Sequence, residues 1–536
     1  MEEFSFGGLI MRVFKVLAHG GTPEFMDDSL LPQVFFSLIF LAVAVAVGYL
    51  FRRSKAVHKN LPPGPPAFPI IGNLHLLKPP VHRTLHKISQ KYGQVFLFRF
   101  GVHPAVIVTS SAAAEECFTK NDIVLANRPP FSVLSKHLNY NFRTISSASY
   151  GDYWRNLRRI GSIEIFSNHR INLFTQIRQD EVGKLLIKLS GKSRGGFARV
   201  QLKSILLDLT LNNTMRMVAG KRYCGNDEIS VGKEAEEFKD LMASIMAKAG
   251  VAHVEDYLPF MGWINGGKFE KDIKLLAART DKFLQGLIDE RRREGLQPED
   301  EATGTMIGHL LSLQESQPHY YDDVTIKGLI LVILLAGTET TAVTLEWAMS
   351  YLVNNPSIME KAKEEIDAVI GEDRLMEEAD VSKLSYLQGI ITETHRLQPA
   401  APLLLPHYSS EDCVIGGYEV PRNTMVVVNA WAIHRDPAAW DDPETFRPER
   451  FVGDATPESH VMMPFGLGRR ACPGSGLAKR VVGHTLGSLI QCFEWRRTGD
   501  EPAETAEGGG AVVSMSKPLE VECRARNLLH KLLTSQ

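Results

Sequence analysis

The sequence has few cysteines and no arrangement of them that suits a cross-linked or metal-binding scaffold. Six cysteines are scattered over 536 residues, with no Cys-x-x-Cys pair and no tight cluster (Cys117, Cys224, Cys413, Cys472, Cys492 and Cys523). Disulfide scaffolds and structural zinc sites both use closely spaced cysteines. Both classes are therefore disfavoured, and a cysteine that carries chemistry must be recognised by its local setting.

The chain also lacks a large net charge of either sign. Lysine and arginine total 60 against 62 aspartates and glutamates, so the formal net charge is -2 and general nucleic-acid binding is disfavoured. An apolar share of 44 % is too high for a disordered protein. At about 150 residues per domain, the length fits three or four domains or one large one.

One uncharged run stands out near the N-terminus. Residues 34–51 carry no charge over 18 residues, which is just enough for a helix that spans a bilayer. Basic residues follow the run and acidic residues precede it, so the C-terminal side is expected in the cytosol. The alternative, a cleaved signal peptide, lacks a small-residue cleavage site after the run. We therefore expect a retained transmembrane anchor.

The segments on either side of this run complete the expected domain plan. Residues 1–25 match neither an anchor nor a transit peptide, so we hypothesise that translation starts at Met26. Residues 61–73 hold five prolines and two glycines, which exclude a helix and favour a stiff, extended linker. We expect an extension on the lumenal side at 1–33, the anchor at 34–51, a basic and proline-rich linker at 52–75 and one folded domain at 76–536.

From about residue 80 onward the hydrophobic periodicity is mostly helical, as in residues 80–92, 175–189, 273–295 and 357–370. Strand-like pieces are short: residues 94–100 and 104–110 predict one hairpin, and residues 413–433 predict a second. There is no internal repeat and no alternating series of strands and helices. The glycines after Cys472 follow no buried strand, which disfavours a dinucleotide-binding motif. The expected fold class is mainly α with small β-sheets, an α+β architecture.

The longest helix is expected from about Asp323 to Asn354, as a core helix because its apolar half is too short for a second membrane span. In the middle of this helix, Ala336 and Gly337 precede Glu339 and Thr340. A buried carboxylate such as that of Glu339 is costly without partners, so this motif calls for an explanation. Two interpretations are open. The small residues could leave a gap for a ligand beside a proton-passing acid and alcohol. Alternatively, the threonine hydroxyl bonds to a backbone carbonyl of its own helix and the glutamate forms an ion pair with a distant residue, so that both are purely structural. Taken alone, this motif favours the second interpretation.

A second motif surrounds Cys472 in residues 464–474, where glycines precede an expected helix that begins near Gly476. Glycines permit positive φ, so the backbone can fold beneath a planar ligand and direct N–H groups at the sulfur. A single thiolate with no other protein ligand nearby fits a metal whose other ligands are the four nitrogens of a porphyrin. The alternative is a buried structural cysteine. The crowding of glycine, arginine and phenylalanine around Cys472 argues against that alternative.

A third motif places Glu393 and Arg396 three residues apart on one helical face. Such a pair contributes little when it lies on the surface. Arg450, a short way before the cysteine loop, could complete a buried Glu-Arg-Arg network instead.

Together, FGLGRRACPG, AGTETT, ETHR and PERF, with their gaps, closely resemble the four signature motifs of the cytochrome P-450 superfamily of haem-thiolate monooxygenases. The resemblance covers nearly all of the chain from the anchor to about Arg526. NRP, YWRNLRR, LLLPHYSSEDC and WDDPETFRPERF resemble a plant microsomal member of the isoflavone hydroxylase-like family. The resemblance implies the cytochrome P-450 fold with a single N-terminal transmembrane helix, in the endoplasmic reticulum membrane with a cytosolic catalytic domain.

The resemblance also implies a role for each matching residue. Cys472 would be the thiolate ligand of the iron of haem b, and Phe465 would shield its sulfur. The haem propionates would be held by the N–H groups of Trp154, Arg158 and Arg470. His407 is a weaker candidate for the same role. Glu339 and Thr340 would be the catalytic acid-alcohol pair that delivers protons to iron-bound dioxygen. The Glu393, Arg396 and Arg450 triad would be structural.

Partners and substrate follow from the same resemblance. Four mostly apolar segments would contact substrate, which predicts a lipophilic or aromatic molecule (residues 128–149, 331–336, 399–405 and 513–515). Residues 256–264 could dip into the membrane interface or pack in the core. Electrons would come from NADPH through an acidic flavoprotein reductase, with cytochrome b5 as a second donor. That reductase would dock on basic residues near the cysteine side of the haem (Arg155, Arg158, Arg159, Arg469, Lys479 and Arg480).

The expected function is hydroxylation or dealkylation of a lipophilic plant secondary metabolite or xenobiotic, such as a flavonoid-type aromatic, with O2 and NADPH. A haem-thiolate isomerase or dehydratase is one alternative, but such an enzyme needs no proton delivery and so no Glu339-Thr340 pair. A non-catalytic, membrane-bound haem-binding protein is another. Dependence on NADPH and a reductase separates the three.

Overall fold

The computed structural model describes residues 60–225, 232–248, 253–295, 304–453 and 458–529 of the chain. The expected extension and anchor, residues 1–51, lie outside the described residues, as does the hypothetical start at Met26. Within the described ranges the chain is mainly helical with small sheets, as the periodicity predicts.

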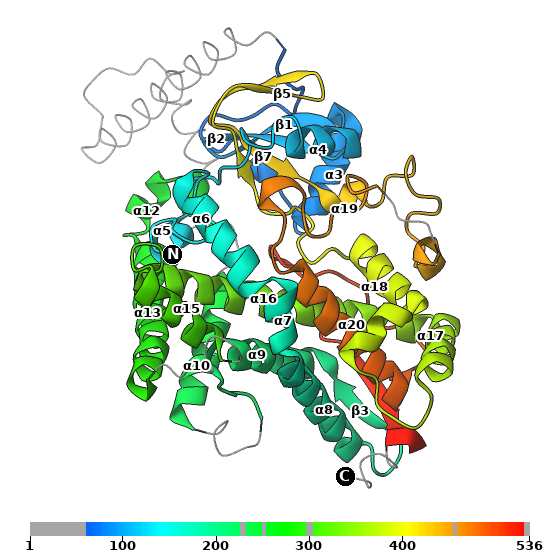
Figure 1. Ribbon diagram of the computed structural model, residues 1–536. Coiled ribbons are helices and arrows are strands. Elements are labelled where there is room, and N and C mark those ends of the chain that lie inside the picture. Colours follow the sequence, from blue (N-terminus) through cyan, green and yellow to red (C-terminus); the bar gives the residue numbers. More distant parts are fainter. Residues whose placement is uncertain (1–59, 226–231, 249–252, 296–303, 454–457, 530–536) are drawn as a thin grey trace, which may run out of the picture.

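Helix α16 (Asp323–Asn354) runs through the middle of the molecule (Figure 1). The Asp322 carboxylate caps it by accepting a 2.7 Å hydrogen bond from the backbone N–H of Thr325. In the described part of the chain, α16 is the one helix long and apolar enough to cross a membrane, with a mean hydropathy of 1.8. However, 67 % of its most apolar window is buried inside the protein. The expectation of a central core helix is confirmed.

The other helices surround α16 because most of its residues are buried and need neighbours on every side. Its C-terminal half packs in one core with α8 (Thr175–Lys192), α9 (Leu202–Ala219), α17 (Pro356–Ile370), α18 (Ser385–Leu397) and α20 (Ser475–Cys492). Its N-terminal half joins a second core with α10 (Lys233–Lys248), α13 (Lys268–Glu294) and α15 (Met306–Ser316). The helices expected at 175–189, 273–295 and 357–370 are all present.

Shorter helices connect these cores to the rest of the fold. They are α3 (Val81–Tyr92), α4 (Ser111–Phe118), α5 (Val133–His137), α6 (Asp152–Ile160), α7 (Asn168–Leu173), α11 (Val254–Tyr257), α12 (Phe260–Ile264) and α19 (Ala430–Ile433).

The largest described sheet lies at one end of the molecule (Figure 1) and has the order β1-β2-β7-β4. Strands β1 (Val95–Phe100) and β2 (His103–Val108) form the first expected hairpin, with Val95 opposite Val108. Strand β7 (Met425–Val428) pairs parallel to β2, and β4 (His407–Tyr408) pairs antiparallel to β7. A second sheet joins β3 (Ala198–Gln201), β9 (Glu520–Ala525) and β8 (Phe493–Arg497) in that order.

The expectation of one hairpin over residues 413–433 is only partly right. Strands β5 (Cys413–Ile415) and β6 (Tyr418–Val420) form a short antiparallel hairpin. The next strand, β7, leaves it because all four of its residues are buried and need neighbours on both sides, which β2 and β4 provide. Residues 430–433 then turn into α19 rather than extending the strand.

The proline-rich segment, residues 61–73, lies against β1. The backbone N–H of Leu97 donates a 2.8 Å hydrogen bond to the carbonyl oxygen of Pro63. A Cβ atom at Gly64 would lie 2.1 Å from the carbonyl oxygen of Leu97, so only glycine permits this approach. Asn73 is almost fully buried. The part of the segment nearest the folded domain therefore packs as a piece of it.

Candidate functional site

The loop before Cys472 is shaped by glycines with positive φ. Gly466 has φ 69° and Gly468 has φ 67°, and a Cβ atom at Gly468 would lie 2.4 Å from the Asp122 carboxylate. That carboxylate accepts a 3.0 Å hydrogen bond from the backbone N–H of Arg469. The loop closes where the N–H of Cys472 donates to the carbonyl oxygen of Phe465 at 2.8 Å. The backbones of Phe465 and Cys472 are thus held together, while the predicted shielding of the sulfur by the Phe465 ring stays a prediction.

The Cys472 sulfur lies beside the N-terminus of α20. The backbone N–H groups of Gly474 and Ser475 donate towards it and, with the nearby charge of Arg158, lower the pKa of the thiol, but burial outweighs them and raises it. The side chain nevertheless keeps accessible surface. Cys472 is therefore exposed, although its neighbours in the loop are mostly half-buried, which differs from a purely structural buried cysteine.

The predicted N–H donors lie around this loop. Arg158, on α6, donates a 2.7 Å hydrogen bond from Nη1 to the carbonyl oxygen of Ala471, the residue before Cys472. The Arg470 guanidinium lies 4.2 Å from the centroid of the Trp154 ring, and Trp154 Nε1 donates to the carbonyl oxygen of Ile145. The structure thus brings Trp154, Arg158, Arg470 and Cys472 together from two distant parts of the chain.

A third guanidinium, that of Arg128, belongs to the same group and was missed by the sequence reasoning. It donates to the carbonyl oxygens of Leu405 and Pro406, both at 2.8 Å. Burial lowers the pKa of Arg128 to about 10. Burial and the charges of Arg128 and Arg158 together lower the pKa of Arg470 to about 9. Arg128 lies in the NRP motif, but that motif does not reveal its role, because its position depends on residues nearly 280 places later in the chain.

This cluster carries positive charge without a matching carboxylate. Within the described ranges, no salt bridge involves Arg128, Arg158 or Arg470. His407 adds no charge, because burial and the two nearby arginines lower its pKa to about 3. Buried cations without counter-ions are costly. The three guanidiniums therefore fit a ligand that brings carboxylates beside the cysteine loop, as the two propionates of a haem would.

The acid-alcohol motif of α16 shows one half of its structural interpretation, the back-bonded threonine, but not the other, the ion pair. Thr340 Oγ1 donates a 2.5 Å hydrogen bond to the carbonyl oxygen of Ala336, so the back-bonded threonine is present. Glu339 has no ion pair among the described residues, and burial raises its pKa while the charge of Lys203 lowers it to a lesser degree. Ala336 is exposed in the middle of a helix that is mostly buried, and its neighbours Leu335 and Gly337 are half-buried. A space for a small ligand therefore borders this turn.

The Glu393, Arg396 and Arg450 network forms as predicted. Glu393 and Arg396 are fully buried and share two hydrogen bonds of 2.6 and 2.8 Å. Arg450 Nε lies 3.4 Å from the Glu393 carboxylate, which also accepts from the backbone N–H of Arg447. Arg396 donates to the carbonyl oxygen of Pro443 as well. The network ties α18 to the chain that leads into the cysteine loop.

The segments expected to contact substrate meet one another. Arg128 bonds to Leu405, and the N–H of Val513 donates to the carbonyl oxygen of Ala400 at 3.0 Å. Trp347, on α16, donates to the carbonyl oxygen of Val513. Segments far apart in the sequence therefore converge beside α16.

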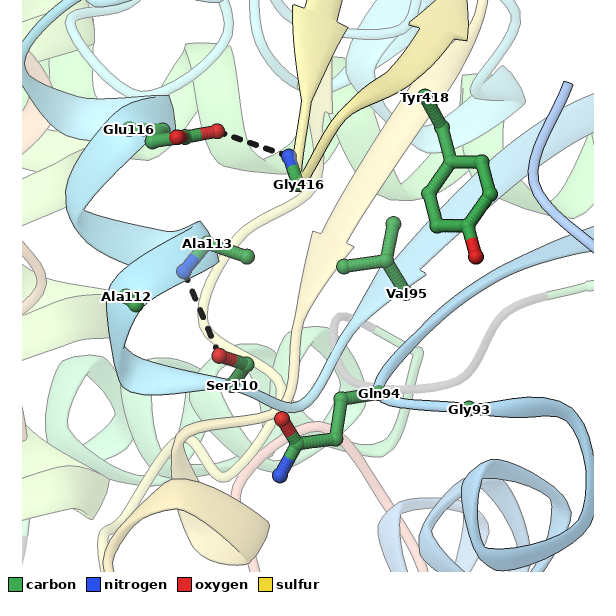
Figure 2. A pocket seen from close by; sticks show the side chains of 9 residues that line it. All are labelled: Gly93, Gln94, Val95, Ser110, Ala112, Ala113, Glu116, Gly416 and Tyr418. Atoms are coloured by element: carbon green, nitrogen blue, oxygen red, sulfur yellow. Dashed lines mark hydrogen bonds between the residues drawn. The ribbon is translucent and has the colours of Figure 1, made fainter. Parts of the chain in front are cut away.

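One hollow lies away from all of these residues (Figure 2). It has a volume of about 260 Å³ between β1, α4 and the turn that joins β5 to β6. Figure 2 shows Ser110 capping α4 through the N–H of Ala113, and Glu116 accepting a hydrogen bond from the N–H of Gly416. These polar groups already have partners, so the hollow is a packing feature.

Comparison with known proteins accounts for this arrangement. Residues 62–523 match the family model described as Cytochrome P-450. The chain is 50 % identical to Cytochrome P-450 81Q32 of Catharanthus roseus, over 95 % of this chain and 99 % of that protein. It is also 50 % identical to the isoflavone 3'-hydroxylase of Medicago truncatula, over 92 % of this chain and 98 % of that one. A zebra fish cytochrome P-450 solved with progesterone superposes with a TM-score of 0.71 and 25 % identity, over 84 % of this chain and 99 % of that one.

Proposed function

This chain belongs to the cytochrome P-450 family and is a haem-thiolate monooxygenase, and we propose that it hydroxylates a lipophilic aromatic plant metabolite of the isoflavone type. The observation that carries the proposal is the cysteine loop with its cluster of guanidiniums that have no carboxylate partner among the described residues, set in a chain half identical to an isoflavone hydroxylase. The apolar segments that converge beside α16 support a lipophilic substrate.

Haem iron, supplied with electrons from NADPH through a reductase, performs the oxygen chemistry when it is bound. We propose Cys472 as its ligand, because this residue is exposed and its sulfur receives N–H groups from the start of α20. Arg128, Arg158 and Arg470 neutralise the propionates, and Trp154 orients Arg470 by stacking against it. The Phe465 carbonyl holds the Cys472 backbone, and its ring, which packs edge-on against His395, would shield one side of the sulfur.

We propose that Glu339 and Thr340 deliver the protons that the reaction needs. Glu339 has a raised pKa, so it gives up and regains a proton closer to neutral pH than an exposed carboxyl does. Thr340 holds its hydroxyl at the exposed turn of Ala336 through the 2.5 Å bond to that carbonyl. The hydroxyl oxygen can accept from a water in this position, and when its O–H turns away from the Ala336 carbonyl it can donate into the space beside Ala336. These two states would let Thr340 relay a proton supplied by Glu339.

A reductase is proposed to dock on the exposed basic residues around the cysteine loop, and cytochrome b5 is the second proposed donor at the same face. Arg155, Arg159, Arg469 and Lys479 are exposed there. The other two expected members have internal partners: Arg158 bonds to Ala471, and Arg480 pairs with the buried Glu378 at 3.3 Å. The docking face is therefore smaller than the sequence suggests.

The membrane-bound state is likewise proposed, with residues 34–51 as a single anchor in the endoplasmic reticulum membrane. The α11–α12 segment supports it, because Trp263 is 88 % exposed and Ile264 is 69 % exposed. Side chains of this kind are stable at a bilayer interface and costly in water. Of the two interpretations of residues 256–264, core packing fits neither of these side chains.

Turnover with a reconstituted reductase tests the function. The full-length holoenzyme, reductase and NADPH are given isoflavones, flavones, terpenoids and herbicides, and products are measured by mass spectrometry. We expect an isoflavone product heavier by one oxygen atom, formed only when NADPH and reductase are present. Turnover of a preformed peroxide without NADPH would instead indicate an isomerase or dehydratase, and no product from any class would contradict the proposal.

A further inference from the structure

A turn near the C-terminus carries one of the segments that are expected to contact substrate, residues 513–515. Its two ends are paired, because Glu507 and Met515 form an antiparallel backbone bridge. The turn also touches the central helix, since Trp347 Nε1 donates a 2.9 Å hydrogen bond to the carbonyl oxygen of Val513. Whatever fixes Glu507 therefore also fixes the substrate segment that follows it.

The Glu507 side chain is only 1 % exposed and accepts three hydrogen bonds from helix α3, 424 residues earlier in the chain. Arg83 donates from Nε at 2.7 Å and from Nη2 at 2.9 Å, one bond to each carboxylate oxygen, and His82 Nε2 lies 2.9 Å from the carboxylate. Burial raises the pKa of Glu507, but these hydrogen bonds outweigh burial and hold the pKa well below its usual range. Such a charge-assisted, two-pronged pair fixes orientation as well as distance. We call Glu507, His82 and Arg83 the α3 clamp.

Trp431, in α19, connects the α3 clamp to a second expected substrate segment, residues 399–405. The Arg83 guanidinium lies 4.9 Å from the centroid of the Trp431 ring, and the centroid of the His82 ring lies 5.1 Å from it. The backbone N–H of Trp431 donates to the carbonyl oxygen of Pro402 at 3.1 Å. The α3 clamp is therefore attached to one substrate segment through Glu507 and to the other through Trp431.

These two segments are also joined to each other and to the guanidinium cluster. The N–H of Val513 donates to the carbonyl oxygen of Ala400, and the carbonyl oxygen of Leu405 accepts from Arg128. Residues 399–405 thus extend from the turn that Glu507 holds to a residue expected to bind the haem propionates. Packed interiors transmit small displacements, so a shift at Glu507 reaches this wall.

We propose that Glu507 is a positioning residue for the reaction, which sets the wall against which the substrate lies and so decides which position of its ring is hydroxylated. Glu507 touches no reacting atom and acts through the turn 507–515 and through the α3 clamp. The proposal rests on the proposed function, because the two segments are expected to contact its substrate. A small error in the placement of that wall changes which carbon atom faces the iron.

Binding of two imidazoles to the haem of the full-length holoenzyme tests the wall without turnover. Both ligands bind the iron through nitrogen, but imidazole is small, whereas N-biphenylylimidazole extends into the pocket. Glu507→Gln keeps the shape of the side chain and removes its charge. It should raise the Kd of the biphenyl ligand on the order of tenfold and leave that of imidazole unchanged. An unchanged Kd for both ligands would overturn the proposal.

Asp380→Asn is the matched control for Glu507→Gln. The Asp380 side chain is 4 % exposed and pairs at 2.7 Å with Arg374, whose side chain is 43 % exposed, much as Glu507 pairs with the 46 % exposed Arg83. The control should lose a similar amount of thermal stability and keep both imidazole affinities. Weaker binding of the biphenyl ligand in Asp380→Asn as well would show a general loss of stability and refute a specific role of Glu507.

Product positions with daidzein, an isoflavone, give a second measurement. Glu507→Gln should change the ratio of its hydroxylated products about tenfold, less than the roughly 100-fold that a displacement of 1 Å can cost. Arg83→Ala removes two of the three hydrogen bonds at a half-exposed residue and should shift the ratio in the same direction. The double variant should shift it no further than Glu507→Gln alone, because the two residues act as one unit.

The two measurements separate this inference from the proposed function. A holoenzyme that does not hydroxylate daidzein contradicts the proposed function, and the imidazole affinities then decide about Glu507. If Glu507→Gln does not retain haem, Arg83→Ala decides instead. A variant that loses thermal stability but keeps its product ratio and its affinity for the biphenyl ligand would make the α3 clamp purely structural and would refute the inference.

Discussion

Arg158 Nη1 donates a 2.7 Å hydrogen bond to the carbonyl oxygen of Ala471, 313 residues later in the chain. This contact fixes α6 against the residue that precedes Cys472, so the guanidinium cluster and the thiol share one frame. The charge of Arg158 also lowers the pKa of the Cys472 thiol. The Arg158 side chain therefore fixes the loop, lowers the pKa of the thiol and offers positive charge to the carboxylates expected on the cofactor.

Replacing Cys472 with serine should abolish the thiolate signature of the reduced, CO-bound protein, because an alcohol oxygen is a much weaker ligand than a thiolate. Absorbance of the reduced protein with and without CO measures this. Cys413→Ser is the control, since that cysteine lies in strand β5 and should leave the spectrum unchanged. A normal signature in the Cys472→Ser protein would remove Cys472 from the iron.

Thr340→Ala should release more peroxide relative to product. The substitution removes the hydroxyl that is held at Ala336, and a positioned proton donor is worth about 100-fold or more in rate. NADPH consumed, peroxide and product are measured together. Thr338→Ala loses a similar 2.7 Å bond, to the carbonyl oxygen of Leu334, at a fully buried position, and should keep its coupling. Equal coupling in both variants would exclude Thr340 from proton delivery.

Glu339→Gln should stabilise the fold at neutral pH while it lowers coupling. Burial raises the pKa of Glu339 above its ordinary value, so the folded state binds more protons than the unfolded state between those two values. Stability therefore falls as pH rises through that window, and the glutamine variant avoids the loss.

Thermal midpoints at acidic and neutral pH measure this effect. The gain of Glu339→Gln should vanish below the ordinary carboxyl pKa, where glutamate is neutral in both states. A gain that is the same at every pH would show that the titration of Glu339 is not its cause.

Glu393→Ala should destabilise the holoenzyme by about 3–5 kcal/mol, because it leaves the fully buried Arg396 without its carboxylate. Thermal unfolding and haem retention are the measurements. Glu360→Ala, which breaks a surface pair with Lys363, should cost less than about 1 kcal/mol. Similar losses in the two variants would mean that the buried network is not a main stabiliser.

Lys479→Glu should slow reduction by the reductase by about tenfold at low ionic strength, because charge on the docking face raises the encounter rate. The effect should fade as salt is added, since screening shortens the range of the charge to about 8 Å at physiological ionic strength. Stopped-flow reduction of the haem measures the rate. Lys282→Glu, exposed on α13, is the control. An unchanged rate for Lys479→Glu would move the docking site elsewhere.

The sequence by itself determined the features that depend on neighbouring residues. The bounds of α16 and its Asp322 cap follow from local apolar content and capping chemistry. The positive φ of Gly466 and Gly468 likewise follows from the residue type, because glycine adopts positive φ without steric cost. The sequence motifs also identified the family, because their residues are constrained by one cofactor rather than by the rest of the fold.

Only the tertiary structure decided the features that depend on distant partners. Strand β7 leaves its expected hairpin for β2, and residues 61–73 pack on β1, because burial and backbone hydrogen bonds are satisfied there. Arg128 joins the guanidinium cluster through carbonyls nearly 280 residues away. Such features arise from the satisfaction of charge and hydrogen bonds across the whole fold, which no local pattern specifies.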